Sequence, residues 1–392
     1  MREPEAWDER EVETPTPFWV SKLRTFIHRL VSGCSARLIF YLLMRMKKIF
    51  ITSLMALIAC FSMQAQVTEL RMATLIQGSK TSVYYGENAF VNAYKAADDT
   101  LGVIILSSGK FSSPNIQKSI SVYGAGMEAN EASQTGRTTI DGFGIYAYKD
   151  YDEKGKEYYK FPNGCHFEGL NIDGTLYVSK DDKQKAELYD LYIKKCIVSS
   201  IEFSYATSHN TLITQSYIKN SISPFRYGDY TQDNFRIFNC YLGYLSNWNN
   251  LTSRINVDHC IISSSTGIAY YTNNIIFGNI SANSTAYNNI FGTEASMSSP
   301  VTSDNNWMNI ANNGIFEAEN EDGSYAAGKT YALKYPKKYI GTDGTEVGLN
   351  GGTYKWDPTP CLPRITSSEI DTRTTTDGKL KVSIKVEAQT AE

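Results

Sequence analysis

The sequence predicts an all-β chain built mainly as a right-handed parallel β-helix, with a short capping helix before it and a small β appendage after it. The first observation is an internal repeat. Residues 191–200, 211–220, 235–244 and 254–263 each place an apolar strand residue three positions before Cys or Ser. These Cys or Ser positions are 20, 24 and 20 residues apart, a period that suits one coil of a β-solenoid. The second observation is composition, because 42% hydrophobic and 20% charged residues can fill a long apolar core.

The repeat predicts which side chains stack. Ile193, Ile213, Ile237 and Val257 occupy equivalent positions and should form an inward column, one residue per coil at about 4.8 Å. The small Cys or Ser three residues later suits the corner where the chain turns. Residues 274–279, 287–291 and 304–307 continue the theme with asparagines, which can form hydrogen bonds along a ladder.

The amino-terminal region predicts export from a bacterial cell. Residues 46–65 have two lysines, an apolar stretch and a small-residue end, the order of a secretory signal peptide. Residues 57–60 also resemble a lipobox, in which case Cys60 would carry a lipid anchor and hold the protein at the outer membrane. Residues 1–45 precede this signal and are expected to be a gene-start error, the alternative being a membrane-inserted extension. The product would be secreted, periplasmic or on the cell surface.

Residues 87–106 predict the cap of the solenoid. Phe90, Tyr94 and Ala97 have helical spacing, and a β-branched run follows at 103–106. After them come SSGKF (107–111), KSISVYGAG (118–126) and TTIDGFGI (138–145). This order of pieces resembles the pectate-lyase-like right-handed β-helix superfamily. The resemblance implies the architecture and does not imply one activity.

The carboxyl end predicts a closing segment and an appendage. Residues 341–352 resemble the glycine-rich closing coil of exported β-helix proteins, so the β-helix is expected to cover 66–357. Prolines at 358, 360 and 363 then indicate a linker. Within 358–392, two strands around Asp377 and Gly378 are expected to form a hairpin, with Leu380, Val382, Ile384 and Val386 as a half-buried strand.

Alternation along the repeated strands predicts the site. If the apolar column points inward, its neighbours point outward. One outward column is then Tyr192, Leu212, Arg236 and Asn256; the next is Lys194, Thr214, Phe238 and Asp258; and Lys195, Gln215, Asn239 and His259 lie beside the corner. Lys194, Arg236, Asp258 and His259 are therefore the candidate catalytic residues.

Metal and acid–base motifs are weak. Residues 256–260, NVDHC, resemble the pectate-lyase strand whose acidic residue helps to bind calcium, but no arginine motif and no cluster of Asp on adjacent coils accompany Asp258. The Asp pairs at 98–99 and 181–182 lie in turns and do not suit inverting hydrolysis. His166 and His209 stand isolated in the sequence. The Cys residues after residue 66 have no metal-binding spacing, so no cofactor and no metal are expected.

Aromatic loops suggest the ligand. The insertion 145–161 carries Tyr146, Tyr148, Tyr151, Tyr158 and Tyr159, and Trp248 lies in an Asn-rich loop. Exposed rings could stack against sugars, whereas the alternative is that they pack the loops against the solenoid. A net charge of −3 without a basic run argues against nucleic acid.

Three functions follow from these patterns. The first is an exported β-helix protein that binds polysaccharide without clear catalytic machinery. The alternative is a polysaccharide lyase or glycoside hydrolase that acts in an outer groove of the solenoid. The third is a structural, adhesin-like surface protein.

Overall fold

The computed structural model describes residues 71–99, 102–129, 136–179, 186–224, 231–246, 255–264, 266–318, 323–359, 362–371, 373–374 and 378–387. These residues belong to one compact unit, 69–392. The predicted signal peptide, its upstream segment and Cys60 lie outside the described residues. Within the described ranges, no helix is long and apolar enough to cross a membrane.

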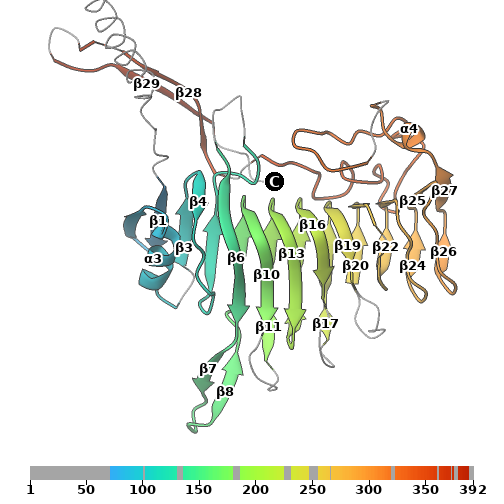
Figure 1. The fold of residues 1–392 in the computed structure, drawn as a ribbon, viewed down its shortest axis with the longest axis horizontal. Helices are drawn as coiled ribbons and strands as arrows, with labels where there is room; N and C mark the ends of the chain where they lie inside the picture. Colours follow the sequence, from blue (N-terminus) through green and yellow to red (C-terminus); the bar gives the residue numbers. More distant parts are fainter. Residues whose placement is uncertain are drawn as a thin grey trace, which may run out of the picture. The chain divides into compact units, whose positions relative to one another are not determined.

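The described chain is nearly all β, and two long sheets dominate it (Figure 1). The 12-stranded sheet has, in spatial order, β2 (Lys80–Tyr85), β1 (Met72–Gln77), β3 (Gly102–Leu106), β5 (Ile120–Tyr123), β9 (His166–Glu168), β12 (Tyr192–Lys194), β15 (Leu212–Thr214), β18 (Phe235–Phe238), β20 (Ile255–Asp258), β22 (Tyr270–Thr272), β24 (Thr285–Tyr287) and β26 (Thr302–Asp304). The 10-stranded sheet has β4 (Gly109–Phe111), β6 (Thr138–Tyr146), β10 (Asn171–Ser179), β13 (Ile197–Ser204), β16 (Tyr217–Ser223), β19 (Tyr241–Leu245), β21 (Ile261–Ile262), β23 (Ile275–Ile276), β25 (Ile290–Gly292) and β27 (Trp307–Ile310).

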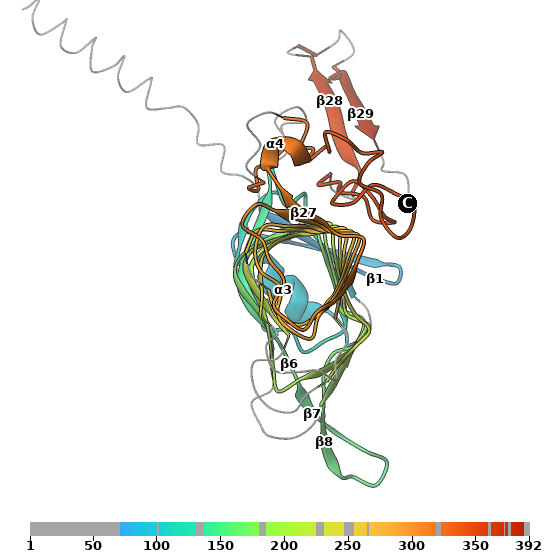
Figure 2. The same cartoon turned by 90° about the vertical axis from the view of Figure 1, so that its right-hand side faces the viewer.

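The chain alternates between these sheets, and neighbouring strands from β3 onward are parallel. A third, short parallel sheet contains β11 (Glu187–Tyr189), β14 (Thr207–His209) and β17 (Gln232–Asp233). Viewed at right angles to Figure 1, the backbones of successive repeats superimpose around the core (Figure 2). The arrangement is consistent with a parallel β-helix, as the sequence predicted.

The inward column is confirmed. Ile193 pairs with Ile213, Ile213 with Ile237 and Ile237 with Val257, and all four side chains are fully buried. The column continues through Tyr271 and Ala286, both also buried. Because each apolar residue meets its equivalent one repeat away, the core is continuous along the stack.

The corner between the two long sheets has a fixed backbone geometry. One residue per repeat has a left-handed conformation, with φ near +50°; this corner column comprises Lys195, Gln215, Asn239, His259, Asn273, Asn288 and Asn305. The next residue points inward, and in the later repeats it is asparagine. Asn274 Nδ2 donates to Asn289 Oδ1 (3.0 Å), and Asn289 Nδ2 donates to Asn306 Oδ1 (3.0 Å). This is the asparagine ladder that the sequence predicted, and it satisfies buried polar groups at the bend.

The segment from 339 to 359, here called the C-terminal arm, differs from the predicted closing coil. It runs along the outside of the repeats and contacts the corner column in reverse order. Its contacts are Ile340 O with Asn288, Thr342 with Asn273, Asp343 with His259, Leu349 O and Gly351 O with Asn239, Lys355 O with Gln215, and Asp357 and Thr359 O with Lys195. A left-handed Lys, Gln or His is costly, and these contacts help to hold each one in place.

Apolar packing also holds the arm. Tyr241, Ile261, Ile275 and Ile290 point out of the 10-stranded sheet, yet they are buried in a second apolar cluster. The cluster is completed by residues that follow β27, the last strand of the 10-stranded sheet, namely Ile315, Phe316, Tyr331, Leu333, Tyr339, Val347 and Leu349. Ile315 ends the short helix α4 (Asn312–Ile315). The outward side of β19, β21, β23 and β25 is therefore covered by this later segment.

The helix predicted at the amino end is confirmed as α3 (Ala89–Ala96). Its buried residues, Phe90 and Tyr94 among them, belong to the main core. In Figure 1 it lies beside β1 and β3, and in Figure 2 it lies within the outline of the repeats.

Two hairpins leave the stack. The insertion after β6 forms antiparallel β7 (Tyr148–Tyr151) and β8 (Glu157–Lys160). The predicted carboxyl-terminal hairpin is present as β28 (Arg364–Ile370) and β29 (Val382–Glu387). The predicted half-buried strand is wrong, however: Leu380, Val382, Ile384 and Val386 are 49 to 56% exposed. Two strands pair with each other, and no described layer packs on their apolar side.

The arm contacts predict the effect of Asn239→Gly. Glycine keeps the left-handed backbone, but it removes the hydrogen bonds from Asn239 Nδ2 to Leu349 O (2.9 Å) and Gly351 O (2.8 Å). Two buried carbonyls then lose their hydrogen-bond donor. We therefore expect the free energy of unfolding to fall by about 1–3 kcal/mol and the backbone amides of the arm to exchange faster. The matched control is Asn283→Gly, also left-handed but exposed. Equal protection of the arm amides from hydrogen exchange in both variants would contradict the contact between Asn239 and the arm.

Candidate functional site

The outer face of the 12-stranded sheet carries the predicted columns. Register pairing aligns Tyr192, Leu212, Arg236 and Asn256 in one column, and Lys194, Thr214, Phe238 and Asp258 in the next. Strand β9 extends both columns by one repeat, because His166 pairs with Tyr192 and Glu168 pairs with Lys194. His166 looks isolated in the sequence, and the strand pairing gives it neighbours.

A polar cluster forms where β9 meets β12. His166 Nε2 lies 3.0 Å from Glu168 Oε2, and Lys194 Nζ lies 3.5 Å from Glu168 Oε1. Glu168 is 3% exposed, whereas the side chains of His166 and Lys194 remain partly accessible. Buried Glu168 therefore positions two half-exposed groups that can reach a ligand.

Aromatic rings border this cluster. The ring of His166 lies 5.2 Å from that of Tyr123 and 6.0 Å from that of Tyr192, centroid to centroid. Tyr123 pairs with Glu168 through β5, so the rings come from three adjacent strands. A row of rings with the cation of Lys194 beside it suits a ligand that has both apolar and hydroxyl faces.

Electrostatics keep Glu168 ionised. Burial raises the pKa of Glu168, but the hydrogen bond from His166 and the charge of Lys194 together lower it by more than burial raises it. The pKa of Glu168 is therefore below its ordinary value. An ionised carboxylate can only accept, so Nε2 of His166 carries the shared proton. Glu168 is thus an anchor for its neighbours and is not a general acid at neutral pH.

Arg236 lies three repeats from His166 on the same column. It is half-buried, and its Nε has no hydrogen-bond partner among the described residues. Beside it, the ring of Phe238 lies 6.2 Å from the ring of Tyr354 in the C-terminal arm. The arm therefore forms one border of the face.

The structure does not bring all four predicted catalytic residues onto one open face. Lys194 and Arg236 remain there. His259 points out of the core as expected, but it is 1% exposed because the arm covers it, with Nε2 3.2 Å from Asp343 Oδ2 and Nδ1 3.2 Å from Gly348 O. His259 therefore secures the arm.

Asp258 is likewise engaged in structure. Its Oδ1 accepts hydrogen bonds from Thr272 Oγ1 (2.8 Å) and Asn273 Nδ2 (2.8 Å). Burial raises the pKa of Asp258, and this effect outweighs the opposing charge of His259 and the two hydrogen bonds. Its contacts tie β20 to the next repeat.

The predicted aromatic binding residues are separate from this face. Tyr148 and Tyr158 share one side of the β7–β8 hairpin, with Lys160 Nζ 5.2 Å from the Tyr148 ring centroid and Tyr158 OH donating to Asp150 Oδ2 (3.1 Å). Tyr146 ends β6 and is half-buried. Trp248 lies outside the described residues.

His209 is not isolated either. Its ring stacks on Tyr189 with a centroid distance of 4.5 Å, and its nitrogens lie 3.7 Å from Glu187 and 3.5 Å from Asp233. The four residues lie on the short third sheet, away from Lys194 and Arg236 in the strand order.

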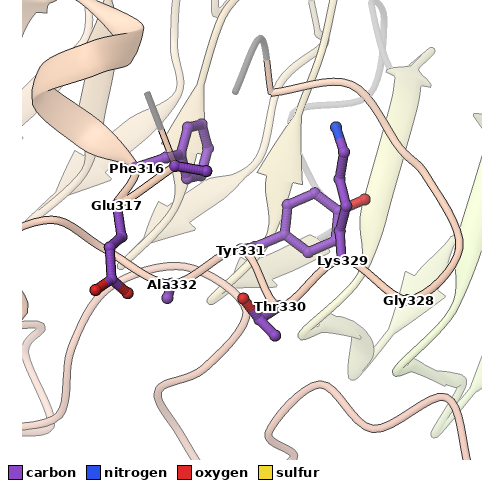
Figure 3. Close-up of a pocket in the computed structure, with 8 residues that line it drawn as sticks. Phe316, Glu317, Gly328, Lys329, Thr330, Tyr331 and Ala332 are labelled. Carbon is purple, nitrogen blue, oxygen red and sulfur yellow. The ribbon is translucent and has the colours of Figure 1, made fainter. Parts of the chain in front are cut away.

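A pocket of about 410 Å³ is lined by residues 316–318 and 328–332, which follow β27 in the chain. Phe316 and Tyr331 belong to the second apolar cluster, and Glu317 and Lys329 add charged groups. In Figure 3, Glu317 and Lys329 lie on opposite sides of Tyr331 and point away from each other. Lys329 Nζ donates to Ser324 O (3.0 Å). The charged groups do not converge on one point, so this pocket is a weaker candidate than the sheet face.

No group of three or more His, Cys, Asp or Glu side chains in the described part of the chain is placed to hold a metal ion. The buried thiols of Cys165, Cys196, Cys240 and Cys260 form no disulfide within the part of the chain that the structure describes. Burial is the main cause that raises the pKa of Cys165 to about 12, so this thiol stays protonated and unreactive.

The repeat pattern in the sequence does not mark His166 and Glu168 as site residues, because the recognisable repeat begins one strand later. Phe167 stands three residues before Leu170, as Ile193 stands three residues before Cys196, and that spacing extends the repeat back by one strand. Leu at the corner in place of Cys or Ser obscured the match.

Comparison with known proteins gives no assignment. A scan of protein-family models, a search of curated proteins and a search of solved structures found no significant match.

The low pKa of Glu168 predicts an acid-dependent loss of stability. A carboxylate whose folded pKa is depressed stabilises the fold fully above its unfolded pKa, about 4.3, and this contribution is lost as pH falls through the lower folded pKa. Glu168→Gln should therefore lower the free energy of unfolding by about 1–3 kcal/mol at pH 7. The difference in unfolding free energy between this variant and wild type should shrink below about pH 4. Chemical unfolding between pH 3 and 7 measures it, with exposed Glu317→Gln as control. A difference that stays constant over this range would contradict the charge argument.

Proposed function

We propose that this chain is an exported bacterial protein that binds a polysaccharide on the outer face of its 12-stranded sheet, without clear catalytic machinery. The observation that carries the proposal is the row of rings Tyr123, His166 and Tyr192 beside the Glu168–Lys194 pair. Rings stack on the apolar faces of sugars, and Lys194 can donate to hydroxyl or carboxylate oxygens.

The rigidity of the face supports this proposal. All three rings stand on strands whose register is fixed by parallel pairing. Buried Glu168 contacts both His166 and Lys194 and so fixes their side chains. Such side chains lose little freedom when a ligand binds. Farther along the same columns, Arg236 offers a second cation for a longer ligand.

The fold assignment is part of the proposal. We interpret the parallel stacks as a right-handed β-helix of the pectate-lyase-like kind, with α3 closing its amino end and β28–β29 as an appendage. We take residues 46–65 as a signal sequence, which supports a location outside the cytoplasm, with a lipid at Cys60 as the anchored alternative.

The ring row predicts the effect of Tyr192→Ala. Removing one stacking ring should weaken retention on the bound polysaccharide about tenfold or more, because a central aromatic contact typically contributes over 1 kcal/mol. Affinity electrophoresis across a panel of neutral and acidic polysaccharides measures it, with Tyr85→Ala on the exposed strand β2 as control. Unchanged retention of Tyr192→Ala would move the binding site elsewhere.

A second candidate, a polysaccharide lyase or glycoside hydrolase, is favoured by the His166–Glu168 hydrogen bond. A carboxylate that orients an imidazole is a common arrangement for a general base. In a lyase, the base would take the proton beside a uronate carboxylate as the glycosidic C–O bond breaks and the leaving oxygen gains a proton.

Product assays separate the two candidates. A binder should retain polysaccharide and release neither unsaturated product, read by ultraviolet absorbance, nor new reducing ends. Turnover that is lost in His166→Ala and kept in the hairpin variant Tyr158→Ala would establish the enzyme in place of the binder. Retention and turnover both absent across the panel would leave the structural, adhesin-like role.

A further inference from the structure

A second hollow lies on the other long sheet. It has a volume of about 500 Å³ and is lined by residues of β4, β6, β10 and β16, the strands of the 10-stranded sheet that precede the arm-covered region. Lys110, Thr139 and Asn171 form its floor as consecutive partners in one outward column. Its volume suits a small molecule of one or two sugar units.

Asn171 is the unusual member of this pocket. It is 4% exposed, and its Nδ2 donates to Thr139 Oγ1 (3.2 Å), but its Oδ1 has no hydrogen-bond partner among the described residues. A buried amide oxygen without a donor is costly, so such groups usually mark a place that a ligand or water completes. The missing group must be a donor, such as a hydroxyl.

The charges at the rim have a definite pattern. Lys110, Arg137 and Lys219 line the pocket, and Asp173 is the single carboxylate among the lining residues that the structure describes. Lys110 also pairs with Asp141, with Nζ 3.2 Å from Oδ1, which leaves Arg137 and Lys219 as the cations without a described carboxylate partner. The pocket therefore combines net positive charge with acceptors at Asn171 and Asp173.

We infer that this pocket binds a uronic acid unit, a sugar that carries one carboxylate. Arg137 and Lys219 would hold the carboxylate through charge-assisted hydrogen bonds, and the sugar hydroxyls would donate to Asn171 Oδ1 and Asp173. A neutral sugar would leave the cations unused. A simple carboxylate would leave Asn171 unsatisfied.

This inference is independent of the first site. The ring row lies on the 12-stranded sheet, whereas the pocket belongs to the 10-stranded sheet, and they share no residue. Even if the ring row binds a neutral polysaccharide, the pocket would still select a sugar that carries a carboxylate.

The test is a calorimetric titration of the purified protein with sodium glucuronate, glucose and acetate at low ionic strength. We expect glucuronate to bind at least tenfold more tightly than glucose or acetate, and to weaken as salt is added. The double variant Arg137→Ala, Lys219→Ala should lower glucuronate affinity at least tenfold, since both side chains are exposed and the fold does not need them. Asn171→Ala should also lower it.

The matched control is Lys154→Ala, Lys337→Ala, which removes two exposed lysines outside the pocket and should leave binding unchanged. The Tyr192→Ala variant should bind glucuronate as wild type does, even if it loses polysaccharide. Equal affinity for acetate, no glucuronate binding, or binding that survives the double variant would overturn the inference. Loss of glucuronate binding in Tyr192→Ala would assign the sugar to the first site and would equally overturn it.

Discussion

Parallel in-register pairing is the constraint on which the structure depends. Because each strand lies beside its equivalent one repeat away, every position in the repeat becomes a column that runs along the stack. Ile213 is buried between Ile193 and Ile237, which are buried too, and the same pairing places Lys194 beside Glu168. Core, corner and outward-facing groups are three columns of one arrangement.

The pattern of the sequence predicts the columns well and predicts their surroundings poorly. The Ile193 column follows from spacing alone, since inward residues must recur once per coil. The accessibility of His259 does not follow, because the residue that covers it, Asp343, lies 84 positions later in a segment without periodicity. Outward direction is a local property, whereas exposure depends on the whole chain.

The two histidines show the same limit from the other side. His166 and His209 looked isolated in the sequence because their partners, such as Tyr192 and Asp233, become neighbours only across strands. Once the register is known, both histidines acquire aromatic neighbours, and His209 also acquires the carboxylates of Glu187 and Asp233; the carboxylate beside His166 belongs to Glu168 on its own strand. The hairpin strand at 382–387 shows the converse case: its alternation predicted the strand, but alternation cannot supply the layer that would bury it.

The reversed path of the C-terminal arm has a consequence for how the molecule is assembled. Lys195 contacts Asp357, 162 positions later, and the intervening contacts use every corner residue up to Asn288. During synthesis, which begins at the amino end, the coils can stack one after another. The C-terminal arm, however, can dock only after the last coil has formed. The arm thus holds together a stack that is already complete, and a coil in the wrong register beneath it would cost some of the contacts between the arm and the corner column.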